Sequence, residues 1–273
     1  MAGTAEATMT RVESRDGTEI AYWTTGEGPP LVLVHGAVAD HTRWRPLLPY
    51  LEPHATVHAM DRRGRGASGD APGYAIEREF EDVAAVVDAV ADASGSAADL
   101  YGHSFGGLCA FGGATLTANV GRLVLYEGWP PVEPGAHRLP PGLGERLEAL
   151  LAAGDHDAVV ETMFREFVLM PPAEVAALRA QPSWPARVAA APALVRELRA
   201  NAEAALDPGQ AARITVPALL LTGSDSGDPF AADTRAVAAA LPDARVVVME
   251  GQQHVADILA PEVVAGHLLA FLR

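Results

Sequence analysis

Short apolar runs alternate with longer helical patterns along most of the chain, and this alternation restricts the fold more than any other feature. The run at 31–35 (LVLVH) is continuously apolar, as expected for a strand covered on both faces of a sheet. Strands that alternate with helices predict an α/β fold, with a mostly parallel central sheet flanked by helices. Other strand-like runs lie at 19–25, 55–60, 98–101, 121–126, 216–222 and 245–249, and helical patterns lie at 76–93, 105–117, 230–241 and 261–272.

A proline-rich segment followed by a purely helical block interrupts this alternation. Residues 129–142 (WPPVEPGAHRLPPG) carry prolines at a spacing that disfavours both helix interiors and central strands. Only helical patterns follow up to residue 206, after which the strand–helix alternation returns. We therefore expect one α/β core made of 1–128 and 207–273, with 129–206 inserted as a helical cap.

Composition excludes several kinds of chemistry and partner. The net charge is −15, so the chain lacks the cationic surface that binds nucleic acid or anionic membranes. All its basic residues are arginine, which excludes a Schiff-base lysine and a phosphate-binding P-loop lysine. Cys109 is the single cysteine, so no internal disulfide or cysteine metal cluster can form. Without a signal-peptide pattern or an apolar stretch of about 18 residues, we expect a cytoplasmic protein.

The stretch Gly102-His103-Ser104-Phe105-Gly106 carries the clearest chemical signal. A Gly-x-Ser-x-Gly pattern alone is only a hypothesis in a glycine-rich chain. Here a strand-like run precedes it and a helical pattern follows, which is the context that a nucleophile elbow requires. The flanking glycines allow the tight turn that exposes the serine. Ser104 is therefore predicted to be a catalytic nucleophile.

A serine hydroxyl needs a base, usually histidine, and an acid that orients this base. In this arrangement the chain order is serine, acid, histidine. Of the histidines after Ser104, His137 and His156 fall in the expected cap and His267 lies inside the last helical pattern. His254 lies in a polar loop (GQQHVAD) after a strand-like run, where ligands meet α/β sheets. His254 is therefore the predicted base.

The acid that would orient His254 has three candidates. Asp225 is preferred, because it lies in the loop directly after the apolar run LLLT. Asp228 lies in the same loop, although an aspartate just before a proline also suits a helix N-cap. Glu127 ends another strand-like run and is the third candidate.

An oxyanion hole requires two backbone N–H groups that point at the developing negative charge. One normally belongs to the residue after the nucleophile, which is Phe105 here. The second comes from a loop after an earlier strand, where His35-Gly36-Ala37 follows the LVLV run. We predict the N–H groups of Ala37 and Phe105 as the two donors.

Taken together, these segments and their order resemble the α/β-hydrolase fold superfamily, in particular its serine esterases and lipases with a helical cap. The resemblance implies a cap between the strands at 121–126 and 216–222. Many members place the acid three residues after a strand-ending glycine, but here that position holds Ser226. The resemblance also implies that Asp61, Arg63, Gly64, Gly66 and Ser68 are scaffold. The matching segments are HGAVAD (35–40), DRRGRGAS (61–68), GHSFGG (102–107), LLLTGSDS (219–226) and GQQHVAD (251–257).

The predicted activity is hydrolysis of an ester or related acyl bond in a small or medium apolar substrate, through a Ser-His-Asp triad and an acyl-enzyme. This chemistry requires neither a metal nor an organic cofactor, and the expected partner is a small-molecule substrate. The alternatives are a thioesterase, acyltransferase, carbon–carbon hydrolase or cyclase/lyase on the same scaffold, or a non-catalytic binding protein. The sequence leaves the oligomeric state open. Apolar cap residues that either pack the cap or line a pocket are Trp129, Met163, Phe164, Phe167 and Trp184.

Overall fold

A single mixed sheet forms the centre of the molecule. The computed structural model describes residues 7–132, 139–226 and 228–273, with the side chains of 228–232 outside this description. The strand order is β1-β2-β4-β3-β5-β6-β7-β8, in which β1–β2 and β2–β4 are antiparallel and all other neighbours are parallel. The α/β-hydrolase fold predicted from the sequence is confirmed. The strands are β1 (Thr8–Glu13), β2 (Glu19–Thr25), β3 (Pro30–Val34), β4 (Thr56–Met60), β5 (Ala98–His103), β6 (Val120–Tyr126), β7 (Ala218–Gly223) and β8 (Ala244–Met249).

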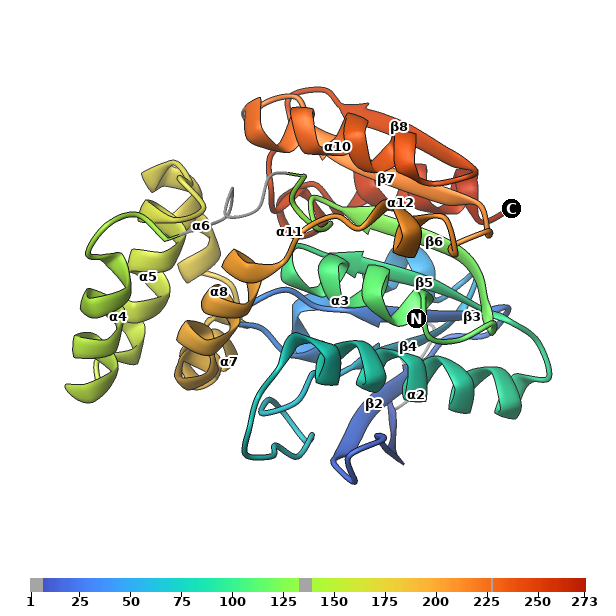
Figure 1. Cartoon of the computed structure of the whole chain (residues 1–273), viewed down its shortest axis with the longest axis horizontal. Helices are drawn as coiled ribbons and strands as arrows, with labels where there is room; N and C mark the ends of the chain where they lie inside the picture. The colour runs from blue at the N-terminus through green and yellow to red at the C-terminus, as the bar shows by residue number, and fades with distance from the viewer. Residues whose placement is uncertain (1–6, 133–138, 227) are drawn as a thin grey trace.

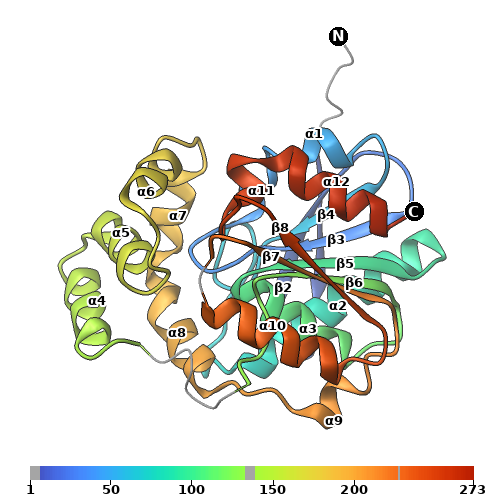
Figure 2. The same ribbon diagram turned by 90° about the horizontal axis from the view of Figure 1, so that it is seen from above.

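Helices cover both faces of the sheet, which explains why its central strands are continuously apolar. Figure 2 shows α1, α11 and α12 on one face and α2, α3 and α10 on the other. Two separate apolar clusters fill the spaces between the sheet and these two layers. Within the described residues, no helix is long and apolar enough to cross a membrane. The helices are α1 (Leu48–Leu51), α2 (Ile76–Ser94), α3 (Phe105–Ala114), α9 (Pro208–Ala211), α10 (Asp228–Ala240), α11 (Ala256–Leu259) and α12 (Pro261–Phe271), with a 3-10 turn at His41–Trp44.

One strand has no counterpart in the sequence prediction. β1 pairs antiparallel with β2 at the edge of the sheet, and all but one of its side chains are exposed. A strand with no buried face lacks the period-two alternation of apolar and polar residues that reveals a strand in a sequence. All the strands and core helices that the sequence predicts are present, although their ends differ from the predicted ones by a few residues.

Between β6 and β7, the described helices α4 to α8 form a layer of their own beside the sheet (Figure 1). We call them the helical insert. They share an apolar cluster that also includes Val38 and Val255 from loops of the core and Ile258 from α11. The insert therefore packs directly on loops at one end of the sheet. Its helices are α4 (Leu143–Ala152), α5 (His156–Glu166), α6 (Pro172–Arg179), α7 (Trp184–Ala190) and α8 (Leu194–Glu203), with a 3-10 turn at Ala191–Ala193.

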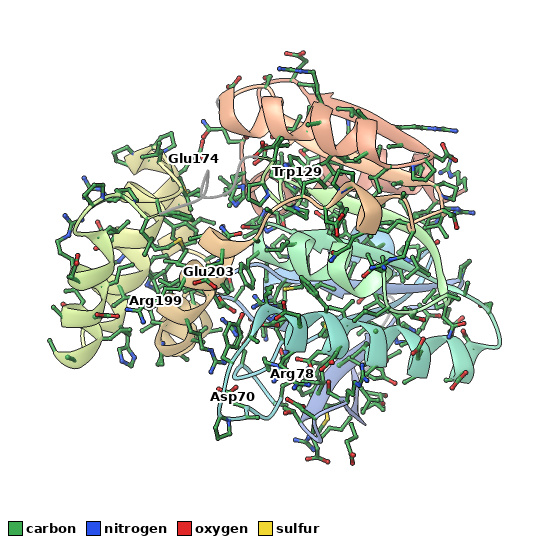
Figure 3. The ribbon with its side chains drawn as sticks, in the orientation of Figure 1. Asp70, Arg78, Trp129, Glu174, Arg199 and Glu203 are labelled. Atoms are coloured by element: carbon green, nitrogen blue, oxygen red, sulfur yellow. The ribbon has the colours of Figure 1, made fainter. Side chains whose placement is uncertain are left out.

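Buried ion pairs also attach the insert to the core. Glu197 of α8 is fully buried and pairs with the guanidinium groups of Arg62 and Arg65, which follow β4. Arg62 also forms a bidentate pair with Glu79 of α2. A more exposed pair joins Arg196 of α8 to Asp70, which Figure 3 labels in the segment after β4. A buried carboxylate is costly unless it is paired, so the pairs of Glu197 with Arg62 and Arg65 restrict where α8 can lie.

Removing Glu197 is expected to destabilise the protein far more than removing an exposed acid of the same insert. Glu197→Ala leaves buried arginine charge without its partner and should lower the free energy of unfolding by about 3–5 kcal/mol. Glu148→Ala removes a half-exposed pair with Arg199 and should change it by less than about 1 kcal/mol. Urea unfolding of both variants and the wild type measures the difference. Equal losses would contradict an anchoring role for Glu197.

Candidate active site

The chain turns sharply at Ser104, between β5 and α3. Ser104 has φ 55° and ψ −133°, a conformation that few residues other than glycine adopt. Glycines make room for this turn, because a Cβ on Gly106 would collide with the carbonyl of His35 and one on Gly128 with the carbonyl of Ser104. A Cβ on Gly102 would lie 2.5 Å from the carbonyl oxygen of Gly106. The sequence pattern therefore corresponds to a strained turn that presents the serine.

Three side chains from separate loops meet at this turn. The Ser104 hydroxyl lies 3.0 Å from Nε2 of His254, and Nδ1 of His254 lies 2.8 Å from a carboxylate oxygen of Glu127. His254 and Glu127 are buried, whereas Ser104 is half-buried. The arrangement has the geometry of a nucleophile, a base and an orienting acid.

The carboxylate that contacts His254 is not the one preferred from the sequence. The exposed side chain of Asp225, the preferred candidate, accepts a hydrogen bond from Ser224, whereas the carboxylate of Glu127 contacts the imidazole. Asp228 begins α10, and its side chain lies outside the described residues. Glu127 is the third candidate from the sequence, and the structure brings it together with Ser104 and His254.

The position of β6 explains why Glu127 reaches the histidine. β6 lies between β5, which ends at the serine turn, and β7, which leads to Asp225. Parallel strands end at the same edge of the sheet, so an acid after either β6 or β7 starts near the same point. Glu127 has φ 43°, and its carboxylate also accepts hydrogen bonds from the Gly223 N–H (2.8 Å) and the Thr222 hydroxyl (3.1 Å).

The surroundings of Glu127 keep its carboxylate ionised. Burial by itself would raise the pKa of Glu127, but the hydrogen bond and charge of His254 and the hydrogen bond from the Gly223 N–H hold this pKa below its ordinary value. An ionised carboxylate at Nδ1 of His254 fixes the ring orientation and leaves Nε2 free to accept a proton from Ser104.

The side chains of His103 and Tyr126 hold the loop that carries His254. The sequence analysis predicts neither of them as a site residue. The Nε2–H of His103 donates to the backbone carbonyl of His254 at 2.6 Å. Burial and the charge of Arg43 hold the pKa of His103 well below its ordinary value, so this ring is neutral. The Tyr126 hydroxyl donates to the carbonyl of Gln253 and accepts from the N–H of Ala256. Hydrogen bonds to the backbone of residues 253, 254 and 256 therefore fix the position of His254.

The predicted oxyanion donors lie beside the serine. Ala37 and Phe105 line the same cavity as Ser104, and neither N–H has a hydrogen-bond acceptor among the residues that the structure describes. The carbonyl of Gly36 accepts hydrogen bonds from Nδ1 of His35 (2.8 Å) and Nη1 of Arg62 (3.2 Å). This carbonyl and the Ala37 N–H belong to one trans peptide and point in opposite directions. Fixing the carbonyl therefore fixes the direction of the Ala37 N–H.

A cavity of about 60 Å³ lies over Ser104 and His254, between the core loops and the insert. It has room for only a few water molecules, since each needs about 10–15 Å³ of such space. Of the apolar cap residues named from the sequence, three line this cavity, whereas Trp129 and Trp184 pack in apolar clusters. Its apolar lining consists of Ala37, Phe105, Met163, Phe164, Phe167, Val168, Leu198 and Val255, and its polar side chains are Arg43, His103, Ser104, Arg187, Asn201 and His254.

The amino-acid sequence and the fold were compared with those of known proteins. The model of a family described as "Alpha/beta hydrolase family" matches residues 31–267, which include Ser104, Glu127 and His254. The chain belongs to the alpha/beta hydrolase family. A solved structure of an alpha/beta hydrolase from Sphaerobacter thermophilus has the same fold as this alpha/beta hydrolase. It has a TM-score of 0.82 and 36% sequence identity, and the match covers 97% of this chain and 100% of that chain.

Two curated relatives match this alpha/beta hydrolase over most of their length. It is 28% identical over 254 residues to the (E)-2-((N-methylformamido)methylene)succinate hydrolase of Acinetobacter baylyi, covering 92% of this chain and 93% of the relative. It is 26% identical over 260 residues to the 2-(acetamidomethylene)succinate hydrolase of Mesorhizobium japonicum, covering 90% of this chain and 89% of the relative. Both relatives are hydrolases.

The segment from Asp61 to Ser68 supports loops of this alpha/beta hydrolase. Asp61 accepts hydrogen bonds from the backbone N–H groups of His41 and Ala67. The Ser68 hydroxyl donates to the carbonyl of Asp61 and accepts from the N–H of Ala21 at 2.8 Å. These contacts agree with the scaffold role that the resemblance implied.

Proposed function

We propose that this alpha/beta hydrolase cleaves an ester or related acyl bond with Ser104 as the nucleophile, His254 as the base and Glu127 as the acid that orients it. The observation that carries the proposal is the continuous chain of contacts from the Ser104 hydroxyl through both nitrogens of His254 to Glu127. The same cavity holds two candidate oxyanion donors.

The first half of the proposed reaction forms an acyl-enzyme. The Ser104 oxygen attacks the carbonyl carbon while its proton passes to Nε2 of His254. The N–H groups of Ala37 and Phe105 stabilise the negative oxygen of the tetrahedral intermediate. When this intermediate collapses, the bond to the leaving group breaks and the leaving group takes the proton from His254. Glu127 stabilises the imidazolium throughout this half.

The second half restores the enzyme. His254 removes a proton from a water molecule, whose oxygen attacks the carbonyl carbon of the acyl-enzyme. The second tetrahedral intermediate uses the same two N–H groups. Its collapse breaks the bond to Ser104, which recovers its proton from His254, and releases the carboxylic acid. The proposed cycle consumes one water molecule for each bond that is cleaved.

We propose a small or medium substrate. The cavity is small, and the apolar side chains of the insert close it on one side. The two curated relatives are named as hydrolases of succinate derivatives, which supports a compact substrate for this chain as well. Similar clefts between a core and an inserted element commonly bind small molecules.

A trapped adduct tests the proposed nucleophile directly. Incubation with a fluorophosphonate probe should modify Ser104 stoichiometrically, because only an activated serine attacks such probes at neutral pH. Peptide mass spectrometry should locate the adduct on the peptide that contains Gly102 to Gly106. Protein unfolded before incubation is the control and should remain unlabelled. A folded protein that is unmodified, or modified only at another serine, would contradict the proposal.

A further inference from the structure

Arg187 is a cavity residue to which the reaction described above gives no role. It lies on α7 of the insert and lines the cavity together with Ser104 and His254. Its side chain is 1% exposed. Its Nη1 donates to the carbonyl of Val38 at 3.4 Å, whereas Nε and Nη2 have no partner among the described residues. A buried guanidinium with open donors is unfavourable and calls for a reason.

Other buried arginines of this protein show what such donors bind. Three of them present the edge formed by Nε and Nη2 to a protein carboxylate, with contacts of 2.7–3.0 Å. Arg65 pairs with Glu197 through Nη2. Among the buried arginines of the described residues, Arg187 is the one that forms no ion pair. The three bidentate pairs are Arg43–Asp257, Arg62–Glu79 and Arg63–Asp82.

Among the described residues, the cavity lining contains no acid that could neutralise Arg187. No aspartate or glutamate lines it in the described part of the chain, and the charge of Arg43 is already matched by Asp257. Burial first, and the nearby charge of Arg43 second, lower the pKa of Arg187 to about 9, so the group remains charged at neutral pH. The cavity lining therefore includes a charged guanidinium, two of whose buried donors, Nε and Nη2, have no partner among the described residues.

We propose that Arg187 binds a carboxylate carried by the substrate, so that this hydrolase acts on small acyl compounds with a free carboxylate in addition to the bond that is cleaved. This inference rests on the function proposed above and names its substrate class. The Nε–Nη2 edge of Arg187 matches the two oxygens of a carboxylate, and a desolvated site strengthens the pair. The apolar lining then contacts the carbon chain between the carboxylate and the reacting carbonyl.

This substrate class changes the expectation of a purely apolar substrate. Phe164 lies under the guanidinium, with its ring centre 5.6 Å from Cζ of Arg187, and holds the cation in place from the side of the insert. Val38, whose carbonyl accepts from Nη1, belongs to the loop of the proposed oxyanion donor Ala37. In a planar guanidinium the Nε–Nη2 edge points away from Nη1, so a carboxylate bound to it would lie on the side of Arg187 that faces away from the Val38 carbonyl.

A pair of nearly isosteric esters tests the proposal. Monomethyl succinate carries a free carboxylate, whereas methyl succinamate carries a neutral amide in its place. We expect the wild type to hydrolyse monomethyl succinate with a kcat/KM at least about tenfold higher, mainly through a lower KM, because a bidentate charged pair is lost in the amide. Arg187→Met keeps an unbranched apolar stem but removes the guanidinium, and it should abolish this preference. Arg187→Lys keeps the positive charge but loses the planar pair of N–H donors, so it should retain part of the preference for monomethyl succinate.

Matched controls separate this proposal from loss of folding and from failure of the proposed reaction. Arg165→Met removes an exposed arginine of the same insert, which pairs with Glu161, and should keep the wild-type preference. Succinate should raise the melting temperature of the wild type but not of Arg187→Met, a readout that needs no turnover.

The outcomes have distinct meanings. Equal kcat/KM for the two esters in the wild type, together with no effect of succinate on its melting temperature, would overturn the carboxylate site even if Ser104 is labelled by the fluorophosphonate. Binding of succinate that depends on Arg187, in a protein whose Ser104 is not labelled, would support the carboxylate site and contradict the proposed reaction. A preference for the carboxylate ester that persists in Arg187→Met would assign recognition to another group and overturn the proposal.

Discussion

Replacing Glu127 by glutamine should reduce kcat on a short p-nitrophenyl ester by about 10⁴-fold, the loss that an amide in place of the triad acid causes in serine proteases. The Glu127 carboxylate accepts from Nδ1 of His254, whereas an amide can present its NH₂ group to Nδ1 and favour the wrong tautomer. Nε2 would then carry the proton and could not accept one from Ser104. Steady-state kinetics of the purified variant measure the loss.

Asp225→Asn is the matched control for this substitution. Asp225 is exposed and contacts Ser224, so its amide should change kcat by less than about threefold, as expected for a surface substitution. The two variants exchange an oxygen for an NH₂ group at the acid that the sequence favoured and at the acid that contacts His254 in the structure. A large loss in Asp225→Asn with near-normal activity in Glu127→Gln would show that the acid has been assigned to the wrong strand.

Ser104→Ala should have an effect at least as large. Removal of the nucleophile lowers kcat by about 10⁴–10⁶-fold in serine hydrolases, and the remaining rate comes from binding and the oxyanion hole. The substitution removes only one hydroxyl, whose contact is Nε2 of His254 at 3.0 Å, so the fold should persist. Hydrolysis of p-nitrophenyl acetate at neutral pH measures the rate, and circular dichroism checks the fold.

Ser96→Ala provides the comparison for this variant. Ser96 is exposed and precedes β5, at the end of the strand opposite the Ser104 turn, and its replacement should leave the rate unchanged. Full turnover by Ser104→Ala would exclude a serine acyl-enzyme. The histidine would then have to activate water directly.

The parts of the site that sequence could predict are those that impose a local backbone requirement. Gly102 and Gly106 flank Ser104 because a side chain at either position would collide with backbone atoms. His254 was found because it follows a strand and lies outside any helix. Such requirements are visible in a few consecutive residues, since they concern the chain next to the functional side chain.

Glu127 and Arg187 could not be assigned in this way, for two different physical reasons. β6 and β7 end side by side, so the choice between Glu127 and Asp225 depends on which side chain reaches His254 across the sheet edge. The sequence does show that the usual position of the acid, three residues after the glycine that ends β7, holds Ser226 and not an acid. For Arg187, the informative property is the lack of a protein carboxylate, which depends on how α7 packs against the core.

The guanidinium of Arg62 gives the insert a direct influence on the reaction centre. One of its terminal nitrogens pairs with Glu197 of the insert, and the other holds the carbonyl whose peptide supplies the Ala37 N–H. The insert is therefore not an interchangeable module. Grafting the equivalent helices of a relative that lacks an acid at this point would remove one of the two carboxylates that hold Arg62, and so loosen its contact with the carbonyl that orients the Ala37 N–H. In such a chimaera we expect kcat to fall even when the substrate still binds, so new specificities are better engineered by changing single cavity residues than by exchanging whole inserts.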